Sequence, residues 1–356
     1  MDIRDFFRTA VQEGGISDIH LTVNSKPIVR KTGELKEYSG YPEVLTNEKM
    51  EEILRILMNE EQLEEFEEKG ELDFSYSIPG LTRFRVNAYR QRGTISVALR
   101  AIPTRVPSIE ELGLPEILKQ IALQRNGLVL CTGPTGSGKS TTLAAMINEI
   151  NEKRNCHILT LEDPIEYLYT HKNCIVHQRE VGIDTRTFAA GLRAALRQDP
   201  DVILVGEMRD LETISIALEA AETGHLVLAT LHTTDAPKTV DRIIDVFPPH
   251  QQQQVRIQLA SCLNAVIAQQ LLPRVDGKGM VAALEILIGT PSVRNIIREG
   301  NSAQLETVMQ TGGKYGMIVM NNYLIQLYER GLINMETVLR RCTNPEYVKK
   351  RLGRIS

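Results

Sequence analysis

Tryptophan is absent from this chain of 356 residues, and aromatic residues as a whole make up only 5% of it. Proteins that bind single-stranded nucleic acid usually stack bases on aromatic side chains above a basic groove. Here such side chains are few and the formal net charge is −4. The low aromatic content and the negative net charge therefore argue against a nucleic-acid motor, although a local basic patch is compatible with both.

Cysteine is also scarce, and no two of the five cysteines have C-x-x-C spacing. Structural zinc sites commonly use such pairs, so we expect no zinc module. The odd number in a long chain argues against a disulfide framework, and reduced cytosolic thiols fit best.

Long apolar runs are missing too. No segment approaches the ~18 apolar residues that span a membrane, and the first residues, MDIRDFFRTA, lack the apolar run of a signal peptide. We therefore expect a soluble, cytoplasmic protein whose contact with a membrane would run through partners.

The length suggests about two domains. Residues 1–100 predict a mixed α and β domain, because ISDIHLTVNSKPIVR alternates apolar and polar residues as half-buried strands do. A helix is predicted from TNEKMEEILRILM, with one apolar face formed by Met50, Ile53, Leu54 and Leu57. The acidic run at 59–71 is interpreted as a solvated helix face.

A hairpin is predicted from TRFRVNAYRQRGTISVALR, and one of its faces carries Arg83, Arg85 and Arg100. A core cannot hold unpaired arginines, so they need solvent, carboxylates or phosphate. Three prolines follow at 103, 107 and 115, which predicts a linker over 101–115. Beyond it, over 116–356, the apolar runs GLVLCT, HILTLE, VILVGE and HLVLATLH predict a mostly parallel sheet buried on both faces.

Residues 133–140 read GPTGSGKS and fit the phosphate-binding pattern G-x-x-x-x-G-K-[ST] at every fixed position, between a predicted strand and a predicted helix. Backbone N–H groups and the helix N-terminus favour phosphate there. We expect Lys139 to reach the β- and γ-phosphates of ATP and Ser140 to ligate Mg²⁺. The predicted nucleotide-binding residues are Gly133, Pro134, Thr135, Gly136, Ser137, Gly138, Lys139 and Ser140.

Hydrolysis also needs acidic groups, and carboxyl ends of strands face the nucleotide in this architecture. LTLEDPIEY offers three at the end of one strand, namely Glu162, Asp163 and Glu166. DPDVILVGEMRD offers Glu207 beyond another strand, where other proteins with this phosphate-binding loop place a metal-facing aspartate. His225 and His232 bracket a further apolar strand and are candidate sensors of the nucleotide state, with a purely structural role as the alternative.

These four segments together resemble the Walker A, Asp box, Walker B and His box of the type II and type IV secretion ATPases. HQREVG, RIIDVFP, VRNIIREGN and QTGGKYGM resemble the type IV pilus retraction (twitching motility) branch of that family, and the similarity covers nearly the whole chain. The resemblance implies a PAS-like α+β domain joined by a linker to a RecA-like P-loop domain with a C-terminal helical region.

The resemblance also implies roles for individual residues of the site. Thr141 joins the ATP-binding residues, Glu166 orients the attacking water, and Glu207 supports Mg²⁺. Glu162 and Asp163 shape the metal site, and the two histidines link nucleotide state to domain position. The three arginines reach a phosphate across a domain or subunit boundary, with surface salt bridges as the alternative.

Partners are implied in the same way: a homohexamer that works on an inner-membrane platform protein, and through it on pilin, from the cytoplasmic face of the inner membrane. No nucleic-acid partner is expected. The alternatives are a pilus assembly or type II secretion ATPase, a RecA-like nucleic-acid motor, and a regulator that binds ATP without turnover. Assembly ATPases usually carry a longer N-terminal region and a four-cysteine zinc module, and the third alternative conflicts with Glu166, Glu207 and Lys139.

Overall fold

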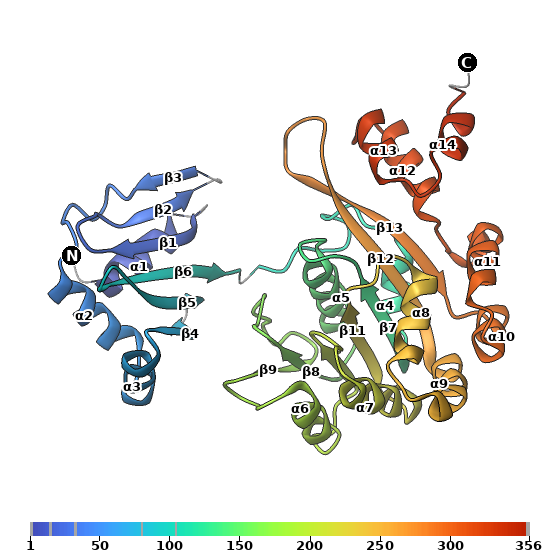
Figure 1. Ribbon diagram of the computed structural model, residues 1–356, viewed down its shortest axis with the longest axis horizontal. Coiled ribbons are helices and arrows are strands. Elements are labelled where there is room, and N and C mark those ends of the chain that lie inside the picture. Colours follow the sequence, from blue (N-terminus) through green and yellow to red (C-terminus); the bar gives the residue numbers. More distant parts are fainter. Residues whose placement is uncertain (1–2, 14–15, 32–33, 80, 104, 354–356) are drawn as a thin grey trace. The chain divides into compact units, whose positions relative to one another are not determined.

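The computed structural model describes residues 3–13, 16–31, 34–79, 81–103 and 105–353. The chain divides into two compact units (Figure 1), Met1–Arg105 with Glu166–Leu168, and Val106–Ile165 with Tyr169–Ser356. The last strand of the first unit continues to Ile102, within the segment predicted as a linker.

The first unit is built on a six-stranded antiparallel sheet of order β3-β2-β1-β6-β5-β4. Its strands are β1 (Ile16–Thr22), β2 (Ile28–Lys31), β3 (Glu34–Glu37), β4 (Glu71–Ile78), β5 (Thr82–Gln91) and β6 (Thr94–Ile102). Its helices are α1 (Ile3–Gln12), α2 (Asn47–Leu57) and α3 (Glu60–Lys69).

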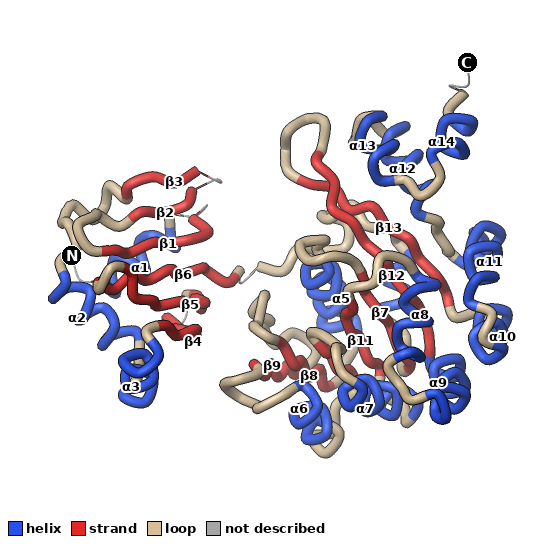
Figure 2. The backbone as a smooth tube through the Cα atoms, in the orientation of Figure 1, coloured by secondary structure: helices blue, strands red, loops and turns tan. Residues whose placement is uncertain are grey.

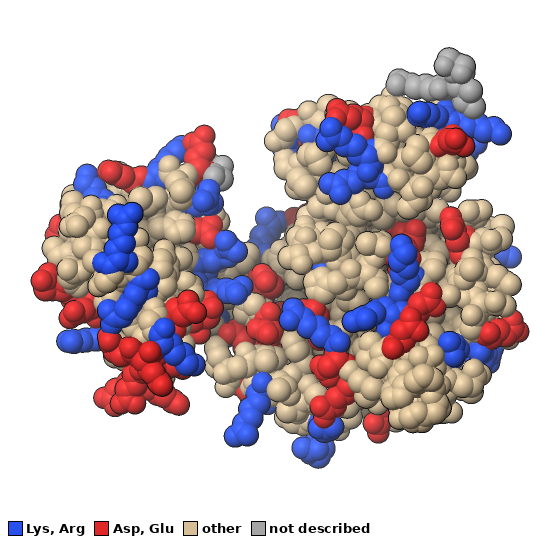
Figure 3. Space-filling view, viewed as in Figure 1, with Lys and Arg blue, Asp and Glu red and all other residues tan. Residues whose placement is uncertain are grey.

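One face of this sheet forms the core with α1 and α2. The predicted helix face is confirmed in α2, whose buried residues are Met50, Ile53, Leu54 and Leu57. The predicted hairpin is confirmed as β5 and β6, which join at Arg92 and Gly93, both with positive φ as a tight two-residue turn requires. The acidic run forms α3, whose one buried residue is Phe66; its carboxylates gather on the surface at the lower end of this unit (Figure 3).

The second unit is built on a seven-stranded sheet of order β13-β12-β7-β11-β10-β8-β9, in which only the β12–β13 pair is antiparallel. Its strands are β7 (Gly127–Thr132), β8 (His157–Glu162), β9 (Ile175–Glu180), β10 (Val202–Val205), β11 (Leu226–Leu231), β12 (Leu263–Pro273) and β13 (Met280–Ile288).

Helices cover both faces of this sheet (Figure 2). The helices of this unit are α4 (Ile117–Ala122), α5 (Lys139–Lys153), α6 (Phe188–Ala195), α7 (Leu211–Glu222), α8 (Ala236–Asp245), α9 (Pro249–Cys262), α10 (Pro291–Glu299), α11 (Leu305–Thr311), α12 (Met320–Glu329), α13 (Met335–Arg341) and α14 (Pro345–Arg351), with short 3₁₀ turns at Ser302–Gln304 and Gly312–Tyr315. None of the helices in the described part of the chain is long and apolar enough to cross a bilayer.

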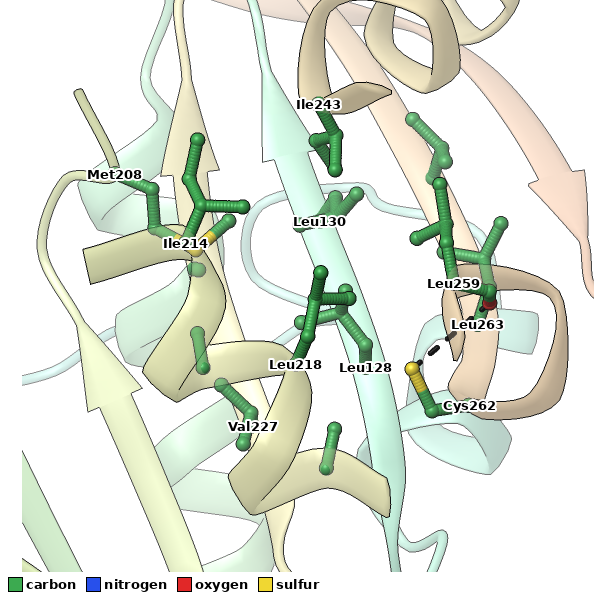
Figure 4. Packing of buried hydrophobic residues seen from close by; sticks show 14 of the residues in the cluster. Leu128, Leu130, Met208, Ile214, Leu218, Val227, Ile243, Leu259, Cys262 and Leu263 are labelled. Atoms are coloured by element: carbon green, nitrogen blue, oxygen red, sulfur yellow. Dashed lines mark hydrogen bonds between the residues drawn. The ribbon is translucent and has the colours of Figure 1, made fainter. Parts of the chain in front are cut away.

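Two apolar layers fill the second unit because successive side chains of a strand point to opposite faces. In β7, Leu128 and Leu130 pack with α7, α8 and α9 (Figure 4), whereas Val129 and Cys131 pack against α5 and α12. Every residue of β7 is buried. The predicted α/β architecture, with a mostly parallel sheet buried on both faces, is thereby confirmed.

The β7 core predicts a measurable stability loss. Leu130 is fully buried, so Leu130→Ala should remove ~2–5 kcal/mol from the free energy of unfolding. Leu123→Ala, at a position 37% exposed, is the control and should change it by well under 1 kcal/mol. Urea unfolding followed by circular dichroism measures both, and equal losses would contradict the packing described here.

Candidate functional site

The predicted phosphate-binding loop joins β7 to α5. Two of its glycines are required by geometry: Gly133 has φ 144° and Gly138 has φ 85°, in the region that favours glycine. A Cβ at Gly133 would also clash with the Gln269 carbonyl oxygen and come within 2.6 Å of Ser137 Oγ. Gly138 is the N-cap of α5, so unpaired N–H groups of the first helical turn adjoin the loop.

Lys139 is the first residue of α5, and its side chain turns back to the loop. Its Nζ donates to the carbonyl oxygens of Gly133 (2.8 Å) and Pro134 (3.1 Å). Burial lowers the pKa of Lys139, while the negative charge of Glu207 acts in the opposite direction. The ammonium group is thus held at the loop with its water largely replaced by protein oxygens, which strengthens its attraction for an anion.

Two observations test whether a nucleotide phosphate fits this loop. The hydroxyl oxygen of Ser137 is buried and has no hydrogen-bond partner within the described chain, and buried polar groups normally have one. The helix N-terminus beside it carries partial positive charge, which favours an anion. A phosphate oxygen would satisfy both, so the residues fit the group.

The carboxyl edge of the sheet gathers the other predicted polar residues. Strand β11 pairs in parallel with β7, and β10 with both β11 and β8. The residues that follow these strands therefore share one edge. The loop follows β7, His232 follows β11, Glu207 lies two residues beyond β10, and Glu162 ends β8.

Glu207 and His232 are in direct contact at this edge. His232 Nε2 lies 2.8 Å from Glu207 Oε1, and Arg209 Nε donates to the same oxygen. Burial, the largest influence, acts to raise the pKa of Glu207. The hydrogen bond from Arg209 and the charges of His232 and Arg209 outweigh it, so the pKa lies below its usual value and the group is ionised at neutral pH.

Glu162 is buried at the end of β8, where its Oε1 accepts hydrogen bonds from Thr160 Oγ1 (2.6 Å) and Gln178 Nε2 (3.2 Å). The next residue, Asp163, is exposed. Both stand at the carboxyl edge, as the sequence suggested. The bonds that Glu162 makes within the sheet favour a part in shaping the site.

No group of three or more His, Cys, Asp and Glu side chains in the described ranges is arranged to hold a metal ion alone. Mg²⁺ prefers hard oxygen ligands and often takes one carboxylate together with phosphate oxygens and water. The hydroxyl of Ser140, in the first turn of α5, and the carboxylate of Glu207 are ligands of this kind. The donor set therefore fits Mg²⁺ bound together with a nucleotide.

His225 lies elsewhere. It precedes β11, and its carbonyl oxygen accepts from Gly127 N (3.0 Å) at the start of β7. The six-residue strand β11 lies between His225 and His232, so the two histidines are roughly 23 Å apart at ~3.3 Å per residue. Its Nδ1 lies 3.0 Å from the Ala220 carbonyl near the end of α7. The structure therefore does not bring His225 to the loop, and this contact supports the structural alternative.

Glu166 and the three arginines belong to the first unit, whereas the loop belongs to the second. Glu166 is exposed. Arg85 and Arg100 lie opposite each other on β5 and β6, and Arg100 Nε donates to Asp18 Oδ1 at 2.8 Å. Arg100 thus has a carboxylate partner, as the alternative of a surface salt bridge requires. That Glu166 and the three arginines approach a phosphate stays a prediction.

An apolar hollow adjoins the loop within the second unit. Its cavity volume is about 100 Å³, and it opens to solvent. Its apolar wall consists of Leu112, Leu114, Leu271, Met280 and Ala282, and its polar wall of Gly138, Thr141, Thr142 and Gln269. A flat apolar group attached to a phosphate in the loop would find cover here.

A model of a protein family described as type II/IV secretion system protein matches residues 46–343. The chain belongs to this family. The type IV pilus retraction ATPase PilT of Pseudomonas aeruginosa is 48% identical over 346 residues, which cover 97% of this chain and 99% of PilT. A twitching motility protein of Neisseria gonorrhoeae is 50% identical over 320 residues, covering 90% of this chain and 85% of that protein.

Among solved structures, the crystal structure of the pilus retraction motor PilT with bound ADP superimposes with a TM-score of 0.90. It is 46% identical to this chain, and the match covers 98% of this chain and 99% of that one. The resemblance inferred from the sequence is therefore confirmed, as is its retraction branch.

Two residues at this edge of the sheet escaped the sequence analysis. Arg209 follows the recognised Glu207 in GEMRD, but no pattern shows that its guanidinium turns back to the carboxylate. Gln269 bonds the loop from β12. Its only signal is a pair of glutamines inside the apolar run NAVIAQQLL.

The contacts of Glu207 predict a pH effect. Because Arg209 helps to hold its pKa down, Arg209→Gln should raise that pKa. Glu207 can supply negative charge at the site only while it is ionised, so the acidic limb of ATP hydrolysis should move to higher pH in this variant. The control is Arg193→Gln, which breaks the exposed pair with Glu212. If the acidic limb of the pH profile does not move in the Arg209 variant, ionisation of Glu207 does not determine that limb.

Proposed function

We propose that this chain is an ATP-hydrolysing motor that powers type IV pilus retraction and twitching motility in the family of secretion ATPases. The similarity to the retraction ATPase PilT carries the proposal, because it runs over 97% of the chain at 48% identity. The loop at Gly133–Thr141 supports it, since its fixed residues, buried lysine and helix N-terminus suit a nucleotide phosphate.

Nucleotide binding is proposed for the backbone N–H groups of residues 133–141 and for the ammonium of Lys139. ATP would draw that ammonium away from the two loop carbonyls, since a phosphate is a stronger acceptor than a peptide oxygen. Ser140 and Glu207 would hold Mg²⁺, which supplies charge neutralisation at the phosphates when bound.

The Glu207–His232 pair suits a sensor of the bound nucleotide. The contact joins the segments that follow two neighbouring strands, β10 and β11. A change of charge next to Glu207 alters the attraction between the two side chains, and His232 leads into the N-terminal cap of α8 at Asp235. We therefore assign His232 to the coupling between nucleotide state and the position of α8.

Glu166 is proposed to orient the attacking water, with Arg83, Arg85 and Arg100 approaching the phosphates from the first unit of the same or a neighbouring chain. Such arginines stabilise the charge of phosphoryl transfer. This arrangement requires subunit contacts, which a homohexamer would provide. The proposed ring acts on a platform protein at the cytoplasmic face of the inner membrane, and through it on pilin.

The apolar hollow is proposed to cover the base of the nucleotide. Leu112 is only half-buried in its wall, so Leu112→Asp should leave the fold intact and place a charge against the base. The expected result is a KM for ATP raised by roughly tenfold, with kcat nearly unchanged, because the lost contact is equal in ground and transition states. The control is Leu123→Asp at an exposed site. A lower kcat with unchanged KM would contradict the assignment.

The loop predicts loss of hydrolysis without loss of the fold. Lys139→Ala and Glu207→Ala should each lower ATP turnover by at least 100-fold, because each removes charge from the site of phosphoryl transfer. Lys153→Ala, at the exposed end of the same helix, should match the unsubstituted protein. Phosphate release measures turnover and circular dichroism measures folding. Normal turnover in either site variant would remove that residue from the mechanism.

Retraction itself is tested by complementation of a mutant that lacks pilus retraction, scoring surface motility and surface pili together. A retraction motor should restore motility and reduce the number of pili to normal, and Lys139→Ala should do neither. Pili that form only when this chain is present would instead identify an assembly motor. That result would overturn the proposed function while leaving the nucleotide site intact.

A further inference from the structure

Gln269 is a buried polar side chain in the middle of an apolar strand. It lies on β12, is 2% exposed, and has both ends of its amide bonded. Nε2 donates to the Ser137 carbonyl oxygen (2.6 Å), and Oε1 accepts from Thr142 Oγ1 (2.7 Å). The carbonyl can only accept, so the amide nitrogen must face Ser137, and the Thr142 hydroxyl must donate to the amide oxygen.

The bond to Ser137 fixes the orientation of a peptide inside the phosphate-binding loop. In a planar trans peptide the C=O and N–H groups point in opposite directions. Because Gln269 holds the Ser137 carbonyl toward β12, the N–H of Gly138 is turned away from the strand. Gly138 is the N-cap of α5, where unpaired N–H groups are available to an anion.

Gln269 also contacts the start of the same loop, at Gly133. Its backbone oxygen packs so closely on Gly133 that a Cβ there would clash with it. The preceding residue, Ala268, pairs with Thr132 at the end of β7. One residue of β12 thus contacts the loop where it leaves the strand and where it enters the helix.

We propose that Gln269 is a positioning residue for nucleotide binding: it holds the Ser137–Gly138 peptide with its N–H directed at the phosphate, and Thr142 orients the Gln269 amide. This role deepens the proposed function and rests on it, since the ligand is a nucleoside di- or triphosphate. Gln269 itself need not touch the nucleotide, because its effect passes through the peptide that it holds.

The first test replaces the amide without emptying its space. Gln269→Met keeps the approximate volume and removes both hydrogen bonds, so the loop peptide is free to turn. Titration with a fluorescent ADP analogue should show a Kd raised at least tenfold. Gln270→Met, at the neighbouring and more exposed position, is the matched control and should change the Kd less than twofold.

The second test separates hydrogen bonding from packing. In Gln269→Glu, an ionised carboxylate cannot donate to the Ser137 carbonyl, whereas a protonated carboxyl can. The Kd should therefore be raised most at about pH 8 and approach that of the unsubstituted protein toward about pH 6, since burial raises the pKa of the introduced group. A defect caused by packing alone would be independent of pH.

Thr142→Val completes a double-mutant cycle. It removes the hydroxyl that orients the amide, so its effect on the Kd should be smaller than that of Gln269→Met, and the two effects should not add. Thermal unfolding of each variant is recorded in parallel to show that it folds. If Gln269→Met fails to fold, the dependence of the Kd on pH in Gln269→Glu tests the positioning role instead.

A Kd within twofold of normal in Gln269→Met, or a defect in Gln269→Glu that does not vary with pH, would overturn the positioning role. Either result would leave the proposed function standing, because the unsubstituted chain would still bind the analogue. Failure of the unsubstituted chain to bind it would overturn the nucleotide assignment, and the role of Gln269 with it.

Discussion

The parallel pairing of β7 with a strand on each side is the constraint on which the site depends. Strand β11 lies on one side and β12 on the other. Because all three run in the same direction, the loop that follows β7 emerges between them. His232 and Glu207 reach the site from the β11 side, and Gln269 supports the loop from the β12 side. Without this strand order, the loop would lack both the contacts from the β11 side and the support of Gln269 from the β12 side.

The two charged groups at the loop, Lys139 and Glu207, each have polar partners within the protein. Lys139 is desolvated and bonded to carbonyl oxygens, while Glu207 is held ionised by Arg209 and His232. Each charge thus has a protein partner that a phosphate or a metal ion can replace. Exchange of partners costs less than exposing an unpaired buried charge, which is why such a site can accept and release its ligand.

The parts of the site that the sequence predicted are those encoded over a few residues. The loop motif, the strand before it and the helix after it are contiguous, and so is the acidic residue beyond β10. The contact of Gln269 with Ser137 joins residues 132 positions apart, and no local pattern encodes such a pair. His225 shows the converse limit: it stands close to His232 in sequence, but an extended strand carries its two ends to opposite edges of the sheet.

The segment that resembles the retraction branch is hydrogen-bonded to the end of α9, which leads directly into β12. Arg294 of α10 donates to the carbonyl oxygens of Ala260 (3.2 Å) and Ser261 in the last turn of α9, directly before β12 begins. Its Nε donates to Gly289 at 2.8 Å. Arg294, the first of the two arginines of VRNIIREG, is therefore engaged within the fold, while Asn295 and Arg298 of the same helix are exposed. Substitutions at Arg294 and at Arg298 therefore report on different properties: the first on the packing of α10 against α9, the second on the exposed surface of α10.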